Sequence, residues 1–318
     1  MSAPALDGIA TVTLNPALDL TAELAELLAG AVNRVTAVQQ DPGGKGVNVA
    51  GFLADWQVRL AVTGLLGTAN AQPFQRLLAA KGIADHFVAV DGSTRTNIKI
   101  VEQDGARITD LNFPGFRVSP EHEQALARTV DMLAAQYGWV LFCGSLPDGV
   151  APDVYARLIA RARAQGARVA LDTSGPPLAA ALAARPQVIK PNGEELSEVL
   201  GTPIETVAQA ADAAREMRRR GIASVIVSLG ADGAVFADAD GVLHAVGQAH
   251  LVRSTVGAGD ALLAGFMLGT LRGLPPADRA RLATGFSLGA LTMLGPHLPP
   301  AATVEGLAAS VSVTPLAP

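Results

Sequence analysis

The chain has 318 residues, 49% of them hydrophobic, and a formal net charge of −5. This size suits one large α/β domain or two smaller ones, and the acidic balance argues against binding to nucleic acid or to an anionic membrane. One cysteine, five histidines without metal-ligand spacing, and no signal peptide or membrane-spanning run predict a cytoplasmic protein without disulfides or a histidine metal site.

The first third of the chain opens with an apolar run, IATVTL, that predicts a core strand. Residues 41–50, DPGGKGVNVA, then predict a glycine-rich turn leading into a helix. This turn is not a Walker P-loop, because Lys45 is followed by Gly46 rather than by Ser or Thr. It is either a tight turn with a solvated lysine or a place where the backbone approaches a polar ligand closely, with Lys45 and Asn48 as additional donors.

The next stretch, STRTNIKIVEQDGARITDLNF, predicts two strands joined around Asp104-Gly105. Strand alternation places Arg95, Asn97 and Lys99 on one face of the first strand. That face is either the solvated side of an edge strand or a row of donors for a phosphate or a polyol. A hairpin within an otherwise βα chain predicts a small β appendage.

From residue 139 onwards, the short apolar runs WVLFCG, RVALD, QVIK and SVIVSLG alternate with helical stretches such as 152–165 and 205–220. This alternation predicts a parallel sheet covered by helices on both faces. Cys143 lies within the first of these runs, which predicts a buried packing role. The strand ends read GSLP, DTSGPP, KPNGEE and SLGADG, and such ends carry ligand loops.

In the stretch KPNGEEL, Asn192 and Glu195 stand three residues apart at a predicted helix start. This spacing is typical of a capping box. It also suits a carboxylate that lies near a phosphate-bound Mg²⁺ and contacts it through water. Spacing alone does not separate the two interpretations.

The stretch STVGAGDALLAGF places Asp260 directly after Gly257-Ala258-Gly259 and before an apolar helical run. The aspartate is either a helix cap or a base beside an anion hole, because small residues leave backbone amides open to a negative oxygen. The positive end of the helix is expected to favour the ionised form of Asp260.

Together and in this order, these motifs resemble the ribokinase-like sugar kinases of the phosphofructokinase B family. GGKGVN and TVGAGD are the most specific motifs, and TLNPALD with NFPGF indicates the phosphosugar branch. The resemblance implies a three-layer α/β/α sandwich with a mainly parallel central sheet and a small β-sheet lid. It implies a single kinase domain over residues 1–318, a lid formed by segments 16–40 and 92–113, and a homodimer that pairs through the lid.

The activity implied is ATP-dependent phosphorylation of fructose 1-phosphate at its C6 hydroxyl, with Mg²⁺ as the metal cofactor. Kinases for tagatose 6-phosphate and fructose 6-phosphate share these motifs and remain alternatives. A dinucleotide oxidoreductase is disfavoured because no G-x-G-x-x-G follows the first strand. A catalytically dead nucleotide-binding regulator is disfavoured because Asp260 and its glycine turn are both present.

The resemblance also assigns roles to individual residues. It implies that Asp260 is the catalytic base and that the amides of Gly257, Ala258 and Gly259 form the anion hole. The positions implied for the sugar phosphate are Asp19, Gly44, Lys45, Asn48, Arg95, Asn97, Lys99 and Ser145. The positions implied for ATP are Lys190, Asn192, Ser228, Gly230, Gly233, Thr255, Gly257 and Gly259. Glu195 is expected to contact Mg²⁺ through water. We expect Lys45, Arg95 and Lys99 to hold the substrate phosphate at the end of the sugar far from Asp260.

Overall fold

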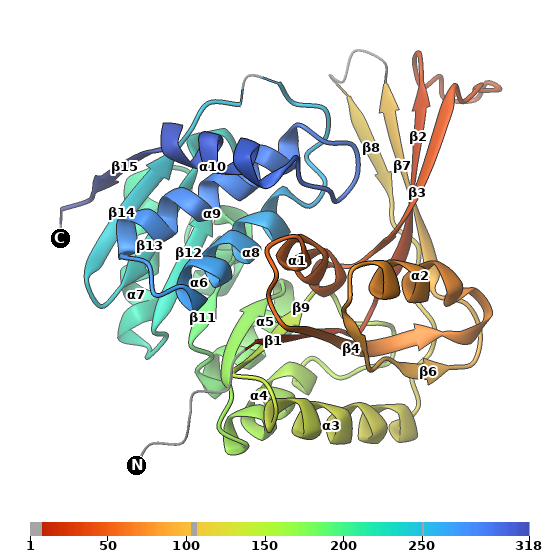
Figure 1. Ribbon diagram of the computed structural model, residues 1–318, viewed down its shortest axis with the longest axis horizontal. Coiled ribbons are helices and arrows are strands. Elements are labelled where there is room, and N and C mark those ends of the chain that lie inside the picture. The colour runs from red at the N-terminus through yellow and green to blue at the C-terminus, as the bar shows by residue number, and fades with distance from the viewer. Residues whose placement is uncertain (1–7, 103–106, 250, 318) are drawn as a thin grey trace.

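The fold is that of a large, mainly parallel sheet between two layers of helices, with a second, smaller sheet at one side (Figure 1). The computed structural model describes residues 8–102, 107–249 and 251–317. The expected fold class is therefore confirmed.

The large sheet has eleven strands. From one edge to the other they are β15 (Ser312–Pro315), β14 (Gly241–Val246), β13 (Ala234–Asp238), β12 (Ser224–Ser228), β11 (Val188–Ile189), β10 (Arg168–Asp172), β9 (Trp139–Cys143), β1 (Ile9–Thr13), β4 (Leu60–Gly67) and β5 (Ala84–Asp85), with β6 (Val88–Val90) also paired to β4. The pairs from β12 to β5 are parallel, whereas β13, β14 and β15 continue the sheet in antiparallel fashion. The four apolar runs predicted as parallel strands are β9 to β12.

Helices cover both faces of this sheet. One layer contains α1 (Lys45–Ala54), α2 (Gln72–Ala80), α8 (Ala258–Leu271), α9 (Pro276–Leu291) and α10 (Ala301–Ser310). The other contains α3 (Pro120–Ala134), α4 (Val154–Ala164), α5 (Gly175–Ala181), α6 (Gly193–Leu200) and α7 (Val207–Arg219). Three short 3₁₀ turns are η1 (Thr68–Asn70), η2 (Leu182–Ala184) and η3 (Gly230–Asp232). The helical stretches expected at 152–165 and 205–220 are α4 and α7.

The strands are apolar on both faces because each face packs under a helical layer. In β9, Trp139, Leu141 and Cys143 belong to the core under α1 and α8, whereas Val140 and Phe142 belong to the core under α3 and α4. The expected packing role of Cys143 is confirmed, since this residue is fully buried.

The small sheet has the strand order β3 (Ala37–Gly43), β2 (Ala17–Leu24), β7 (Arg95–Glu102) and β8 (Ile108–Leu111). It stands out from the main body on the side of α1 and α2 (Figure 1). Its strands lie in the segments expected at 16–40 and 92–113, except that β3 continues to Gly43 and leads directly into α1. The turn expected at Asp104-Gly105 lies outside the described residues.

Within the part of the chain that the structure describes, none of the helices has both the length and the apolar character needed to cross a membrane.

Candidate active site

A cavity of about 380 Å³ lies where the small sheet meets the ends of the central strands and the first residues of α1 and α8. All eight residues expected to bind the sugar phosphate line this cavity, namely Asp19, Gly44, Lys45, Asn48, Arg95, Asn97, Lys99 and Ser145. Gly257, Asp260 and Glu195 line it as well. The fold therefore brings together, around one space, residues that are more than 200 positions apart in the sequence.

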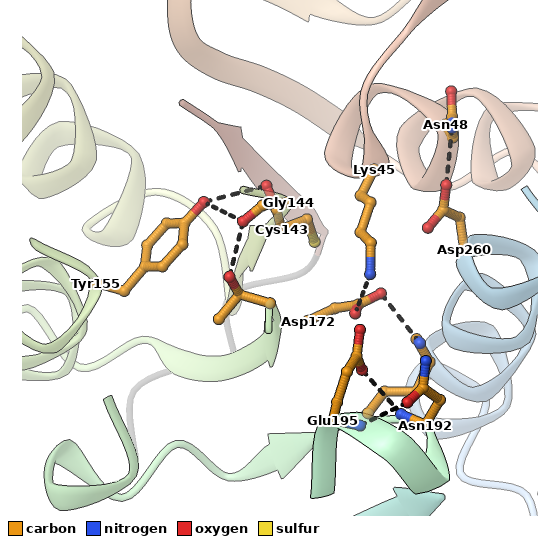
Figure 2. Close-up of polar contacts among 11 residues, drawn as sticks. Lys45, Asn48, Cys143, Gly144, Tyr155, Asp172, Asn192, Glu195 and Asp260 are labelled. Atoms are coloured by element: carbon orange, nitrogen blue, oxygen red, sulfur yellow. Dashed lines mark hydrogen bonds and ion pairs between the residues drawn. The ribbon is translucent and has the colours of Figure 1, made fainter. Parts of the chain in front are cut away.

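Asp260 lies in the first turn of α8, and its carboxylate faces α1 (Figure 2). The N-cap of α8 is Gly257, in a left-handed conformation with φ of +74°, so Asp260 is the third residue of the helix rather than its cap. Its Oδ2 accepts a 2.7 Å hydrogen bond from Nδ2 of Asn48. The residue is 7% exposed, and it lines the cavity. A buried carboxylate with one neutral donor and access to the cavity suits a general base.

Burial raises the pKa of Asp260 to about 6. The positive charges of Lys45 and Lys190 and the hydrogen bond from Asn48 act in the opposite direction, whereas the negative charge of Asp172 raises the pKa further. The expectation that the helix N-terminus would favour the ionised form is therefore wrong in its net direction, because desolvation outweighs it. A base with a pKa just below neutrality is largely ionised at neutral pH and binds a proton more strongly than an ordinary aspartate.

Asp172 is a fully buried carboxylate that pairs with two lysines. Figure 2 shows its contact with Lys45. Its Oδ1 accepts a 2.8 Å hydrogen bond from Nζ of Lys45, and its Oδ2 lies 3.3 Å from Nζ of Lys190. Although burial opposes the change, the two ammonium groups lower the pKa of Asp172. For Lys45, burial lowers the pKa, because it disfavours the charged ammonium group. The negative charges of Asp172, Asp260 and Glu195 outweigh this effect and raise the pKa of Lys45 above its ordinary value. Lys45 and Asp172 therefore both stay charged.

The position of Lys45 differs from what we expected. Its ammonium group is bound to Asp172 and is electrostatically coupled to Asp260, so it sits among the carboxylates rather than with Arg95 and Lys99. The reason is that Lys45 is the first residue of α1 and extends towards the carboxyl end of β10. The sequence spacing could not reveal this pairing.

The double glycine before Lys45 allows the small sheet and α1 to meet closely. Gly44 has a φ of +114°, a conformation that side-chain-bearing residues rarely adopt. A Cβ atom on Gly43 would lie 2.2 Å from Oδ2 of Asp19. The glycines therefore hold Asp19, Lys45 and Asn48 around the same cavity.

The small sheet contributes paired polar side chains to the cavity. Asn97 donates from Nδ2 to Oδ1 of Asp19 at 3.1 Å, and Lys99 forms an ion pair with Asp110. Burial raises the pKa of Asp19, although its donor Asn97 and the cations Lys99 and Arg95 lower it. Asp19 and Asn97 offer both an acceptor and a donor to a hydroxylated ligand.

Arg95 is anchored by three backbone carbonyl groups. Its Nη2 donates to Asn15 at 3.1 Å, its Nη1 donates to Phe113 at 3.1 Å, and its Nε donates to Pro16 at 3.4 Å. These three bonds leave one hydrogen on each terminal nitrogen for an anion, because a guanidinium group has five donors. Arg95 is therefore held in place and can still bind a phosphate.

Ser145 lies in a turn after β9 whose backbone is held by hydrogen bonds from two side-chain hydroxyl groups. The buried hydroxyl of Tyr155 donates to the carbonyl groups of Cys143 and Gly144, at 3.2 and 3.0 Å. Thr173 also donates to the carbonyl of Gly144, at 2.9 Å. Gly144 has a φ of +96°, which turns the chain sharply so that Ser145 lines the cavity.

A second cavity of about 380 Å³ is lined by five of the residues expected to bind ATP. These are Ser228, Gly230, Gly233, Thr255 and Gly259. Gly257 lines the first cavity instead, so the turn at the start of α8 separates the two spaces. Lys190 and Asn192 do not line the second cavity, although a Cβ atom on Gly259 would lie 3.5 Å from Nζ of Lys190.

Asn192 and Glu195 form the capping box that their spacing predicts. Asn192 Oδ1 accepts from the backbone amide of Glu195 at 2.8 Å, and Glu195 Oε2 accepts from the amide of Asn192 at 2.9 Å. Glu195 also lines the first cavity. The two interpretations of the motif are therefore compatible, because the cap uses one oxygen of this carboxylate and fixes the direction of the other.

Several cavity residues had not been singled out from the sequence. They are Asn15, Asp110, Asn112, Thr173 and Ser174, together with the buried Asp172 behind the lysines. A signal was present for Asp172, because it ends a buried parallel strand where ligand loops begin. Asp110 carried no such signal, since its strand reads as a solvated edge. Asn112 belongs to the NFPGF motif, which indicated the family branch without assigning this residue a role.

Known proteins resemble this chain over nearly its whole length. The family model described as pfkB family carbohydrate kinase matches residues 12–299. A 1-phosphofructokinase of Rhodobacter capsulatus is 50% identical over 311 residues, which cover 98% of each chain. Those of Xanthomonas campestris and Escherichia coli K12 are 44% and 39% identical and cover 87% of this chain, and 89% and 88% of their own lengths.

Solved structures share the same architecture. Phosphofructokinase-2 from Escherichia coli, in complex with substrates and products, superposes with a TM-score of 0.89 at 28% identity and covers 95% of this chain and 98% of its own. A possible 1-phosphofructokinase from Thermotoga maritima gives a TM-score of 0.89 at 26% identity, with coverage of 97% and 99%.

Proposed function

The chain belongs to the pfkB family of carbohydrate kinases, and we propose that it transfers the γ-phosphoryl group of ATP to the C6 hydroxyl of fructose 1-phosphate. The products are fructose 1,6-bisphosphate and ADP. Relatives that bear the name 1-phosphofructokinase at up to 50% identity support this substrate. The structural observation that carries the proposal is the position of Asp260, buried beside the helix-start turn and facing the cavity that holds Arg95 and Lys99.

Asp260 is the group that takes the proton from the reacting hydroxyl. Phosphoryl transfer passes through a loose transition state, so catalysis depends mainly on positioning and on charge stabilisation. As the bond from the C6 oxygen to phosphorus forms, the hydroxyl proton passes to the carboxylate of Asp260. Asn48 orients that carboxylate through its 2.7 Å hydrogen bond. A positioned base of this kind contributes about 10²–10⁴-fold.

The turn Gly257-Ala258-Gly259 is proposed to stabilise the phosphoryl group during transfer. Its backbone amides lie at the N-terminus of α8, where the helix dipole favours negative charge. The turn lies between the sugar cavity and the second cavity, since Gly257 lines one and Gly259 lines the other. This position supports binding of ATP in the second cavity, with its γ-phosphoryl group directed at Asp260.

The nearby residues suit a Mg²⁺ ion that is held largely by phosphate and water. Among the described residues, no three His, Cys, Asp or Glu side chains are grouped to hold a metal by themselves. This agrees with Mg²⁺ sites that use one or two carboxylates and substrate phosphates. Glu195 is the residue proposed to contact the hydrated ion, because it lines the cavity and its capping bond fixes its orientation. When bound, the ion neutralises charge on the phosphates.

The phosphate already present on the substrate is proposed to lie against the small sheet. Arg95 retains two free donors there, and Lys99 lies on the same strand face. Binding energy from this remote phosphate positions the C6 hydroxyl at Asp260. Lys45, which is bound to Asp172, is proposed instead to act on charge near the reacting oxygens.

Coupled ADP-release assays on the purified protein test this proposal. We expect kcat/KM for fructose 1-phosphate to be well above the values for fructose 6-phosphate and tagatose 6-phosphate. A preference for either 6-phosphate would overturn the substrate assignment and leave the kinase assignment intact. No ADP release with any of the three sugars would overturn both. Fructose 6-phosphate is an informative competitor, because a solved Escherichia coli phosphofructokinase-2 complex contains it.

The small sheet is proposed to act as a lid over the sugar and as the contact of a homodimer. Apolar side chains are exposed on its β2–β3 hairpin, among them Leu28 at 52%, Val32 at 88% and Val38 at 62%. Burial of this surface against a second copy would remove it from water. Light scattering after size exclusion should give twice the monomer mass, and Val32→Glu with Val38→Glu should reduce it to the monomer. A wild-type monomer would contradict the dimer.

A further inference from the structure

Three polar side chains join the lid to the loop that follows α9. Oδ1 of Asp41, on β3, is 3.2 Å from Nε2 of His297. Oδ2 of the same carboxylate accepts a 2.8 Å hydrogen bond from Nε2 of Gln39. The Gln39 and His297 nitrogens are 3.4 Å apart. The side chain of Asp41 is 13% exposed and that of His297 is 41% exposed, so the contact is partly buried, with Asp41 as its more buried member.

The loop that carries His297 packs against the start of α8. A Cβ atom on Gly257 would lie 3.4 Å from Cα of Pro296, the residue before His297. The preceding Gly295 has a φ of +71°, and a Cβ atom there would lie 2.5 Å from Oδ2 of Asp41. The loop is therefore fitted closely on one side to the turn of the anion hole and on the other side to the lid.

At the lid end, Asp41 lies beside the sugar-binding residues. In the register of β2 and β3 it pairs directly with Asp19, which is hydrogen-bonded to Asn97 of β7. Two residues after Asp41, the chain reaches Gly43 and passes into α1. In Figure 1 the blue loop between α9 and α10 lies on the side of the molecule that faces the lid.

We infer that Asp41 and His297 are positioning residues that couple the lid to the anion hole. When a phosphosugar fixes the lid, Asp41 holds His297, and Pro296 supports Gly257 in the geometry that receives a nucleotide phosphate. The sugar then strengthens nucleotide binding without touching the nucleotide. By linkage, the nucleotide strengthens sugar binding by the same factor. This inference rests on the proposed function, because it requires a sugar and a nucleotide to bind at the two cavities.

Calorimetric titration of ADP, with and without saturating fructose 1-phosphate, measures this coupling. ADP is chosen because it lacks the γ-phosphoryl group that would touch the sugar directly. We expect the sugar to tighten ADP binding at least about fivefold in the wild type, the low end of known couplings. His297→Ala should bring the ratio close to one, and His297→Gln, which retains a side-chain N–H donor, should restore most of it. Asp41→Ala should match His297→Ala, and the double variant should add nothing further.

A matched control is the Asp131–Arg161 ion pair between α3 and α4, which is also partly exposed. Arg161→Ala should leave the coupling ratio at its wild-type value. A wild-type ratio of one, or a ratio unchanged by both His297→Ala and Asp41→Ala, would overturn the inference. Failure of the proposed substrate is distinguished by turnover: if the wild type uses a different phosphosugar, that sugar replaces fructose 1-phosphate in the titration.

Discussion

Asn48 and Asp260 are 212 positions apart in the sequence, and yet Nδ2 of Asn48 lies 2.7 Å from Oδ2 of Asp260. The contact joins the first turn of α1 to the first turn of α8 at the first cavity, where the sugar is proposed to bind. Asn48 is itself buried, at 8% exposure, so its amide has little freedom to turn away. The pair fixes the direction of the carboxylate of Asp260, the proposed general base.

Replacement of the base should remove turnover and retain the fold. We expect Asp260→Asn to lower kcat by at least about 10²-fold, the low end for a lost general base, because an amide cannot take the C6 proton. ADP affinity should stay near wild type, since no anion-hole amide is removed. Steady-state kinetics and ADP titration measure the two effects. A variant that turns over at a near wild-type rate would reduce Asp260 to a structural residue.

The pH profile should report the raised pKa of the same group. Asp260 must be ionised to act, and its pKa in the free enzyme is about 6. We therefore expect kcat/KM for the phosphosugar to rise tenfold per pH unit below about pH 6 and to level off above it. The profile is measured between pH 4.5 and 8 with stability checked at each point. A profile that stays level down to pH 4.5 would contradict the burial argument.

Because its pKa is raised, Asp260 lowers the free energy of unfolding at neutral pH. Its pKa is 3.8 in the unfolded chain and about 6 in the folded protein, so the folded state resists losing this proton as the pH rises. The cost is absent below pH 3.8, grows through this interval and is complete above pH 6. At about 1.4 kcal/mol per pKa unit, Asp260→Asn should raise the free energy of unfolding by about 3 kcal/mol at pH 8.

Urea titrations of both proteins measure this difference. The gain should fall to roughly half at pH 5, because the folded wild type is then mostly protonated and the unfolded chain is not. A gain of equal size at both pH values would assign it to packing instead of to ionisation. Loss of stability in the variant at pH 8 would contradict the prediction outright.

The lid cations should affect one substrate only. We expect Arg95→Ala and Lys99→Ala each to raise KM for the phosphosugar by about 10- to 100-fold, since a charge-assisted hydrogen bond is worth about 1.5–3 kcal/mol. KM for ATP should change little, because neither residue lines the second cavity. Arg161→Ala, on α4, is a surface arginine control. Equal effects on both substrates would indicate that these residues only support the hairpin.

Asp172 should matter for stability and for the base at the same time. Asp172→Asn leaves Lys45 and Lys190 without their shared counterion, and breaking a buried ion pair costs about 3–5 kcal/mol. Because the charge of Asp172 raises the pKa of Asp260, its loss should also shift the midpoint of the kcat/KM profile below pH 6. Urea unfolding and the pH profile test the two parts. An upward shift of the midpoint would contradict the assigned electrostatics.

The sequence predicted the features that depend on residues close together in the chain. Apolar runs of five residues became buried parallel strands, because such runs are stable only when both faces are covered. The spacing of Asn192 and Glu195 produced a capping box, since both partners lie within one helical turn. The family resemblance carried by the motifs in their order predicted the fold class, and eleven of the residues it named line the first cavity.

Only the tertiary structure decided the electrostatics of the site. A local argument from the helix N-terminus predicted a lowered pKa for Asp260, but burial by distant elements raises it. The pairing of Lys45 with Asp172 depends on where α1 ends up relative to β10, 127 positions away in the chain. Desolvation and ion pairing are set by everything that surrounds a group in space, and no window of sequence contains that information.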